Sequence, residues 1–412
     1  MLKYENYTLA NGLNLLVHQD EKSDIAAVNL MYNVGSRDEH PDMTGLAHLF
    51  EHLMFEGSAN VPVFDRELEM AGGENNAFTN KDITNYYITL PAVNLETALW
   101  LEADRMESLS LTQEKLDIQK SVVIEEFKER YLNQPYGDVW SLATDLSYNA
   151  HPYKWSTIGK EIGHIKKVKR EDVLNFYSRF YAPDNVVLAV ASPINPDKVY
   201  NLVNKWFGDI PLAPHPYERD LPVEPVQTEA RFKEVVRSVP SSMIVRTYPM
   251  SERLSNRYYI HDLISDVLAD GDSSRLKNQL VKNEELFSQI DAYISGDIEP
   301  GLFVIAGKVH DNVSLLQANE AIDKELDKIV SDKITLKELE KAKNKALLRL
   351  EEEKTGVLEK AMNLSYFELL GNAAMFEQQN EYYKNITAEN FLEECQSLFA
   401  KSKQNTLFYR AE

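Results

Sequence analysis

The stretch TGLAHLFEHLMFEGS, residues 44–58, decides how the rest of the chain is interpreted. It has the composition of an apolar helix, yet it carries His48 and His52 four residues apart and Glu51 beside the second histidine. Positions i and i+4 lie on one face of a helix, so both imidazoles can face a single point. Two imidazoles, one oxygen ligand and an open fourth position describe a catalytic zinc site. Glu51 projects near the same face and can act as a general base towards a water held there.

Chance is the alternative to a metal site, because short motifs arise by accident and histidines in apolar helices are usually satisfied core or surface residues. Against chance, three polar side chains among Gly, Leu, Phe and Met would be costly to bury without a shared purpose. A metal site also needs a third ligand on a neighbouring element. The segment LDIQKSVVIEEFKERY, 116–131, offers Glu125, Glu126 and Glu129. Apolar residues such as Val122 set its buried side, and Glu126 lies nearest to that side while the other two face solvent.

Composition limits the kind of protein. The 412 residues suffice for two or three domains, and 43% apolar with 26% charged residues is ordinary for a soluble globular protein. A formal net charge of -21 argues against nucleic acid or an anionic membrane as the main partner. Cys395 is the one cysteine, which excludes an intrachain disulfide and a thiolate metal cluster. It lies among apolar residues at helical spacing, so we expect a buried, inert thiol.

The beginning of the chain, MLKYENYTLANGLNLLVHQD, lacks the basic and then apolar layout of a secretory signal. No later segment approaches the roughly 20 apolar residues of a membrane span. The expectation is a cytoplasmic protein, or a periplasmic or exported one if a signal has been removed.

Strands and helices surround the motif. Asn11-Gly12 between two apolar segments predicts a hairpin, and Thr44 or the HPDM before it is a plausible start for the motif helix. The other predicted elements are, in chain order, a strand within 25–36, a Gly-rich turn at 71–73 leading into a strand that ends at Pro91, helices over 92–108 and 112–132, and a buried strand over 185–192.

A proline-rich segment divides the chain into two similar halves. Five prolines and no apolar period mark a linker, 211–228, between a first domain, 1–210, and a second, 229–412. Two pairs of segments match across it at an offset near 220: 168–190 with 386–409, and 111–126 with 334–349. Because both matches share one offset, we infer a duplicated domain.

The residues also resemble a known family. HLFEHLMFEGS (48–58), with SVVIEEFKERYLNQPYG (121–137), is similar to the pitrilysin and insulinase zinc peptidases, which include the mitochondrial processing peptidases. H-x-x-E-H is the inverzincin signature. The resemblance extends over nearly the whole chain, including NNAFTNKDITNYYITLP (75–91) and GDSSRL (271–276). It implies an α+β fold of two homologous domains, each an antiparallel sheet packed with helices, and a dimeric clam shell as in other half-length members.

The resemblance implies one zinc per chain, on His48, His52 and Glu126, with Glu51 activating the water. Many members carry a glutamate seven residues before the third ligand, near the metal but not on it. Here that position is Gln119, which keeps a hydrogen-bonding oxygen but loses a charge, so zinc affinity and ligand basicity can differ.

The family's substrate strand matches NNAFT. By resemblance, Asn76, Ala77 and Phe78 lie along an extended peptide, which adds to the sheet edge through main-chain hydrogen bonds. Ordinary core packing is an equal alternative for Phe78. Main-chain pairing depends little on sequence, so such a site suits short or unfolded peptides.

The second half carries no metal motif, and Glu126 aligns with Arg349. In related proteins this half contributes an Arg and a Tyr, seven residues apart, that bind substrate and stabilise the oxyanion. Those positions fall at Val281 and Ser288, which cannot replace them. We therefore expect the zinc-bearing subunit of a heterodimer whose homologous partner supplies the Arg-Tyr pair, with a homodimer as the alternative.

A zinc endopeptidase is thus the leading interpretation. The first alternative is a catalytically weak subunit of the same fold that binds peptides or supports assembly, in favour of which Val281 and Ser288 count weakly. The second is another metallohydrolase with the same ligands, which the match to a peptide-binding strand disfavours.

Overall fold

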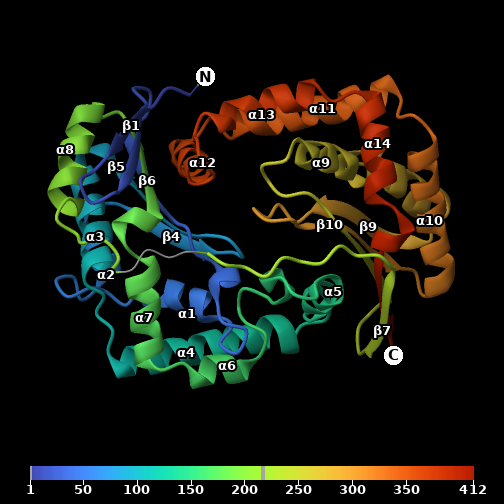
Figure 1. Cartoon of the computed structure of the whole chain (residues 1–412), viewed down its shortest axis with the longest axis horizontal. Coiled ribbons are helices and arrows are strands. Elements are labelled where there is room, and N and C mark those ends of the chain that lie inside the picture. The colour runs from blue at the N-terminus through green and yellow to red at the C-terminus, as the bar shows by residue number, and fades with distance from the viewer. Residues whose placement is uncertain (1, 215–218) are drawn as a thin grey trace. The chain divides into compact units, whose positions relative to one another are not determined.

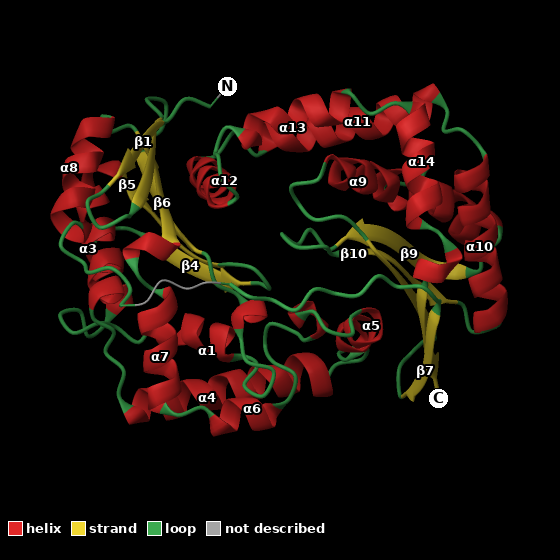
Figure 2. Ribbon diagram, viewed as in Figure 1, coloured by secondary structure: helices red, strands yellow, loops and turns green. Residues whose placement is uncertain are grey.

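The computed structural model describes residues 2–214 and 219–412, and these form two compact units (Figure 1). Each unit is a β-sheet with helices packed against it (Figure 2). This confirms the α+β class and the two-sheet organisation expected from the sequence. Among the described residues, no helix is both long enough and apolar enough to span a membrane. Unit 1 comprises Met1–Phe127, Ser156–Leu221 and Glu351–Gln378, and unit 2 comprises Lys128–Trp155, Pro222–Leu350 and Gln379–Glu412.

The sheet of unit 1 has six strands in the order β1-β2-β6-β3-β5-β4. All neighbours are antiparallel except β2 and β6, and every residue of β6 is buried, as its continuous apolar sequence predicts. β4 is an edge strand that pairs only with β5 within the sheet. The strands are β1 (Glu5–Thr8), β2 (Asn14–Gln19), β3 (Ile25–Tyr32), β4 (Glu74–Thr79), β5 (Thr84–Pro91) and β6 (Val186–Ser192).

The predicted hairpin at Asn11-Gly12 is confirmed, since β1 and β2 pair antiparallel around it and Gly12 has the positive φ of 81° that this turn requires. The helices that belong to unit 1 are α1 (Leu46–Leu53), α2 (Phe64–Met70), α3 (Leu95–Glu107), α4 (Gln113–Phe127), α6 (Ile162–Lys167), α7 (Arg170–Phe180), α8 (Pro196–Phe207) and α12 (Val357–Leu369).

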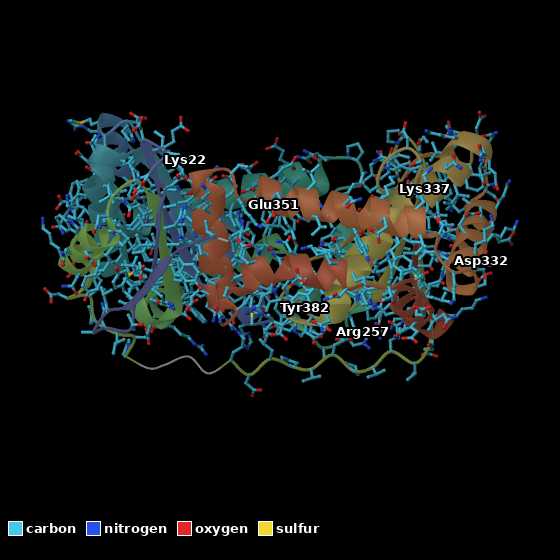
Figure 3. All side chains as sticks on the ribbon, turned by 90° about the horizontal axis from the view of Figure 1, so that it is seen from above. Lys22, Arg257, Asp332, Lys337, Glu351 and Tyr382 are labelled. Carbon is cyan, nitrogen blue, oxygen red and sulfur yellow. The ribbon has the colours of Figure 1, made fainter. Side chains whose placement is uncertain are left out.

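Unit 2 repeats this plan with five strands in the order β7-β11-β8-β10-β9. Its one parallel pair, β7 with β11, matches the pair β2 with β6 of the first sheet. The strands are β7 (Arg231–Arg237), β8 (Met243–Pro249), β9 (Phe287–Ile294), β10 (Leu302–Val309) and β11 (Asn405–Ala411). The helices are α5 (Val139–Ser147), α9 (Asn256–Ala269), α10 (Leu315–Ser331) and α14 (Ala388–Leu398), with most of α11 (Leu336–Glu352) and the second part of α13 (Met375–Lys384). Figure 3 labels Lys337 near the start of α11 and Glu351 near its end.

The internal repeat predicted from the sequence has a structural counterpart. The matched segments contain α7 followed by β6 in the first half and α14 followed by β11 in the second. The other matched pair gives α4 and α11. The order of elements before them is also repeated, since α1 follows β3 as α9 follows β8.

The two units are not simple chain halves. α12 comes from the second half but packs on β3 and β6 of unit 1, while α5 comes from the first half and packs on β8 and β11 of unit 2. Small apolar residues let α12 approach its sheet closely: Ala361 and Leu364 are buried together with Ala27 and Ala189. Each compact unit is therefore built from three segments of the chain, and the two units do not coincide with the predicted domain ranges 1–210 and 229–412. Of the predicted linker, residues 215–218 lie outside the described residues.

One element was predicted incorrectly. The segment before Pro91 forms a hairpin of β4 and β5 where a single strand was expected. Asn80 makes the turn, because its Oδ1 accepts hydrogen bonds from the backbone N–H groups of Asp82 and Ile83 at 2.7 and 2.9 Å. Residues 74–77 are of types that are depleted in strands, so the first arm of this hairpin was not recognised in the sequence.

Candidate metal centre

The motif helix α1 begins at Leu46, directly after a glycine in the left-handed conformation. Gly45 has φ 89°, and a Cβ there would lie 2.6 Å from the backbone oxygen of Ile158. Glu39 caps the helix: its carboxylate accepts from the N–H of Gly45 at 2.9 Å and of Ala47 at 2.8 Å. A carboxylate at this position also complements the helix dipole. Thr44, the expected start of the helix, is instead buried and pairs with His164 at 2.9 Å.

The apolar side of α1 fixes the direction of its polar side. Leu49, Phe50 and Leu53 are buried. The Phe50 ring packs 4.2 Å from the Tyr181 ring. His48 and His52 therefore point away from this packing, towards α4.

The structure brings the three predicted metal ligands together. Glu126 Oε2 lies 3.7 Å from His48 Nε2 and 3.6 Å from His52 Nε2. All three side chains are partly buried, with exposed fractions of 14%, 25% and 17% for His48, His52 and Glu126. In the part of the chain that the structure describes, this is the one group of His, Cys, Asp or Glu residues whose donor atoms lie close enough together to bind a metal.

These separations fit a tetrahedral metal ion. Ligand atoms about 2.1 Å from zinc lie about 3.4 Å from each other. The distances of 3.6 and 3.7 Å between the histidine nitrogens and the glutamate oxygen are close to that value. Two imidazoles and one carboxylate are the donor set of zinc peptidases and leave one coordination position for a water.

Charge near the three ligands favours a cation. Burial opposes protonation of His52, but its hydrogen bond to Glu126 and the charge of Glu51 raise its pKa. Because a proton and a metal compete for the same nitrogen, metal binding should weaken as the pH falls.

Glu51 lies beside the ligands without joining them. Its Oε2 accepts a hydrogen bond from Thr79 Oγ1 at 2.5 Å. Burial raises the pKa of Glu51, and the hydrogen bonds from Thr79 act against that rise. A general base with a pKa above the ordinary value for glutamate can take a proton from water and give it back within one reaction cycle.

The predicted substrate strand is β4, at the edge of the sheet. Asn76 and Phe78 are exposed and Ala77 is partly covered. Phe78 is 40% exposed, which excludes core packing as its role in this unit. Because β4 ends at Thr79, the edge strand leads directly to the hydroxyl that holds Glu51.

The other acidic residues near Glu126 are exposed, as expected for residues that are not ligands: Glu125 lies on α4 and Glu129 just beyond its end. Val122 was expected on the buried side but is 43% exposed, so that expectation was wrong. Val123 and Phe127 alone fix the buried side there.

Gln119 lies on α4 seven residues before Glu126. Its Nε2 donates to Glu56 Oε1 at 2.5 Å. Gln119 also contributes to the raised pKa of His52, so it lies near this predicted ligand.

Unit 2 has no comparable group among its described residues. At the positions corresponding to α1 and α4 it has α9 and α11, where Arg349 Nη2 donates to Asp266 at 2.8 Å and to Asp262 at 3.4 Å. Burial raises the pKa of Asp266 to about 6. Val281 packs against the core of unit 2, and the Ser288 hydroxyl donates to a backbone oxygen of the neighbouring strand.

Comparison with known proteins shows the family to which the chain belongs. Residues 14–139 match the family described as Insulinase (Peptidase family M16), and residues 167–346 match the Peptidase M16 inactive domain. A relative from Helicobacter pylori named zinc protease PqqE is 31% identical over 83% of this chain and 78% of its own length. The chain belongs to peptidase family M16.

Other M16 proteins support the same assignment. The β subunit of the mitochondrial-processing peptidase of Saccharomyces cerevisiae is 24% identical over 81% of this chain and 75% of its own. A crystal structure of a Helicobacter pylori protease superposes with a TM-score of 0.92 at 26% identity and covers the full length of both chains. An M16 inactive-domain structure from Pseudomonas fluorescens, at 17% identity and a TM-score of 0.88, shares the fold over all of this chain and 98% of its own.

Three residues near this candidate metal centre were not found from the sequence. Thr79 closes the NNAFT segment, and its position at the end of the predicted substrate strand was the only available signal. Glu39 and Glu56 gave none, because the partners they bind depend on how the chain folds back around α1.

Proposed function

We propose that this M16 chain is a zinc-dependent endopeptidase that cleaves short or unfolded peptides. The observation that carries the proposal is the approach of His48, His52 and Glu126 to within bonding distance of one ion, with the Glu51 carboxylate beside them. Zinc suits two imidazoles and a carboxylate better than harder ions do. When bound, it would supply Lewis-acid polarisation of the scissile carbonyl and lower the pKa of a water.

The chain's own residues would do the rest of the chemistry. Glu51 takes the proton of the attacking water on one carboxylate oxygen, while Thr79 holds the other. The same carboxyl group then gives this proton to the amine that leaves. Since Glu51 is held from the side of β4, a peptide lying along this strand passes close to the base.

Peptide binding is proposed to occur on β4. Its outer edge is not paired within the sheet, so an extended peptide can add as a further strand through backbone hydrogen bonds. Asn76 and Phe78 alternate with Ala77 along that edge and would contact neighbouring side chains of the peptide. A folded substrate cannot offer a free strand, which limits this site to short or unfolded chains.

We further propose that the chain is the catalytic subunit of a heterodimer. Val281 and Ser288 lack the guanidinium and phenol that stabilise an oxyanion, so a homologous partner would supply them. The periplasmic protease PqqL of Escherichia coli has this fold over 47% of its length, at 18% identity and a TM-score of 0.81, so its chain is about twice as long. A chain of that length has room for a second part of similar size, and in the proposed heterodimer a separate subunit would take the place of that part.

Replacing Glu51 by Gln tests the peptidase proposal. Zinc content and cleavage of an unstructured fluorogenic peptide would be measured on the same samples, for the chain alone and with a candidate partner that carries the Arg-Tyr pair. We expect Glu51→Gln to bind zinc like the wild type and to lose at least about 100-fold in turnover. Turnover that survives this substitution would contradict the proposal.

The alternative is a subunit that binds peptides or supports assembly without cleaving. The absence of Arg and Tyr from positions 281 and 288 favours it. It predicts peptide binding that is indifferent to Glu51→Gln, and no cleavage with any partner. Rapid peptide cleavage by the chain as a verified homodimer would instead contradict the heterodimer proposal. The peptidase proposal would remain.

A further inference from the structure

Lys115 joins the first turn of α4 to the turn that follows α1. Its Nζ donates to the Glu56 backbone oxygen at 2.5 Å and to Ser110 Oγ at 3.1 Å. One helical turn further along α4, Gln119 Nε2 donates to the carboxylate of the same Glu56 at 2.5 Å. Both the backbone and the side chain of Glu56 are therefore held by α4, and all of these residues belong to unit 1.

The backbone connects Glu56 to the histidines of α1. The N–H of Glu56 donates to the backbone oxygen of Leu53 at 3.1 Å. The N–H of Phe55 donates to the backbone oxygen of His52, also at 3.1 Å. Such bonds between residues three apart are frequent at the ends of α-helices, and here they continue α1 as far as Glu56. A constraint on Glu56 is therefore also a constraint on the position of His52.

On the other side of this contact, Lys115 and Glu126 lie on one continuous helix, α4. Positions i and i+11 of a helix are three turns apart on the same face. This face meets α1 at two places: Lys115 holds Glu56, and Glu126 Oε2 lies 3.6 Å from His52 Nε2. Lys115 thus fixes one end of the contact between the two helices, and the predicted metal ligands lie at the other end.

We propose that Lys115 is a positioning residue for the metal centre. By holding the end of α1 against the start of α4, it sets the separation of the two helices and thereby the distance from the two histidines to Glu126. Ligands that are held at the required spacing bind an ion at a lower cost in ordering. This inference rests on the proposed zinc centre and goes beyond it, since Lys115 is no ligand and needs no contact with substrate.

The variant Lys115→Met distinguishes positioning from the effect of charge. An ammonium group near the centre repels a metal cation, so the loss of its charge alone should strengthen zinc binding. Lys115→Met removes both hydrogen bonds as well. We expect its zinc affinity, measured by competition with a chromogenic chelator, to fall about 10-fold, because the metal must then also supply the free energy that orders α1 against α4.

Lys120 provides the matched control on the same helix. Its Nζ also donates two hydrogen bonds, to the backbone oxygens of Lys166 and Val168 at 2.8 Å each, but these bonds join α4 to the end of α6. Lys120→Met therefore loses the same charge and as many hydrogen bonds, and its zinc affinity should stay within about two-fold of wild type. An equal loss of affinity in both variants would overturn the proposal, because any loosening of α4 would then weaken metal binding.

Two further measurements separate positioning from a direct effect on the ligands. Lys115→Arg keeps the charge and the N–H donors on a long side chain, so it should recover most of the affinity that Lys115→Met loses. Cobalt-loaded Lys115→Met, at saturating metal, should show the visible absorption spectrum of cobalt-loaded wild type, because its three ligands are unchanged. A changed spectrum, or the same loss of affinity in Lys115→Arg, would overturn the proposal.

Circular dichroism checks that each variant is folded. If Lys115→Met does not fold, Lys115→Gln carries the same test, because its amide is too short to reach the position of Nζ. Wild type that binds no zinc would defeat the proposed metal centre together with this inference. Wild type that binds zinc, with equal or higher affinity in Lys115→Met, would overturn the inference alone.

Discussion

Thr79 and Glu51 are 28 residues apart in the chain and meet at the metal centre. A carboxylate near a metal can rotate so that either oxygen, or both, binds the ion. The Thr79 hydroxyl at 2.5 Å holds Oε2 of Glu51 and would thereby keep this carboxylate off a bound metal, with its other oxygen available for a water. In the proposed mechanism, this contact separates the role of a base from the role of a ligand.

Thr79→Val removes this hydroxyl and keeps the shape of the side chain. We expect turnover to fall about 10- to 100-fold with KM and zinc content unchanged, because the base is present but no longer oriented. Thr79→Ser should recover most of the loss, and Thr89→Val on the neighbouring strand β5 is the control. Steady-state kinetics are measured in the assembly found to be active. A rise in KM with unchanged kcat would show that Thr79 serves the substrate strand and not the base.

Cys395 gives a prediction that needs no activity. It is fully buried on α14, and burial raises the pKa of its thiol. Thiol reagents attack the thiolate, so native protein should show almost no reaction with Ellman's reagent at pH 8. One equivalent should react once guanidinium chloride unfolds the chain. Rapid reaction of the native protein would contradict the buried position.

The sequence predicted the site residues that lie near each other in the chain, and those whose position follows from the periodicity of a single helix. His48 and His52 are four apart on one helix, and the buried side of α4 selected Glu126 over Glu125. Contacts such as that of Glu56 with Gln119, 63 residues apart, depend on how two helices pack, and no local pattern specifies that. The family resemblance supplied Gln119 but not Glu56, the carboxylate to which its amide donates.

At the scale of elements, α12 shows what periodicity leaves open. Its apolar face predicts burial but does not say against which sheet, and it packs on β3 and β6 of unit 1. Polar contacts make this choice specific. Asn29 donates to Ser365 at 2.6 Å inside the contact, and Lys360 pairs with Asp20 at 2.6 Å near its rim. Both members of that ion pair are largely covered, with exposed fractions of 12% and 13%.

Lys360→Met keeps the apolar stem and removes the charge. We expect unit 1 to lose about 1 to 3 kcal/mol of stability at pH 7, read from hydrogen exchange of α12, because a hydrogen-bonded charge is left without its partner. The exposed Lys337 on α11, labelled in Figure 3, provides the control Lys337→Met. Equal protection of α12 in the wild type and Lys360→Met would show that apolar packing alone holds this helix.

The same pair predicts a pH dependence. Its hydrogen bond with Lys360 lowers the pKa of Asp20. A carboxyl group with a lowered pKa in the folded state stabilises the fold above its ordinary pKa of about 3.9, and this stabilisation is lost as the pH falls through the lower folded value. The difference in α12 protection between the wild type and Lys360→Met should therefore be full at pH 7 and shrink below about pH 4. A difference that persists at pH 2 would exclude this ion pair as its cause.

At the scale of the whole molecule, duplication has produced two units that hold equivalent helices by different means. In unit 1, α1 and α4 present His48, His52 and Glu126, whose donor atoms lie close enough together for a cation to join them. In unit 2, the guanidinium of Arg349 reaches Asp262 and Asp266 and joins α11 to α9 as a permanent cation. The sequence alignment of Glu126 with Arg349 indicated this difference, but only the structure shows that Arg349 meets two acids of the helix corresponding to α1.

Metal should therefore stabilise one unit and not the other. At free zinc about 100 times its dissociation constant, binding adds about 2.7 kcal/mol to unit 1, which slows hydrogen exchange through its global opening about 100-fold. We expect this protection in α1 and α4 and none in α9 and α11, measured by mass spectrometry with zinc and with a chelator at the same pH. The variant His48→Ala should abolish the difference. Zinc-dependent protection of similar size in α9 and α11 would contradict this prediction, because it would show that both units unfold together. The ion pairs of Arg349 would then not explain why unit 2 is stable without a metal.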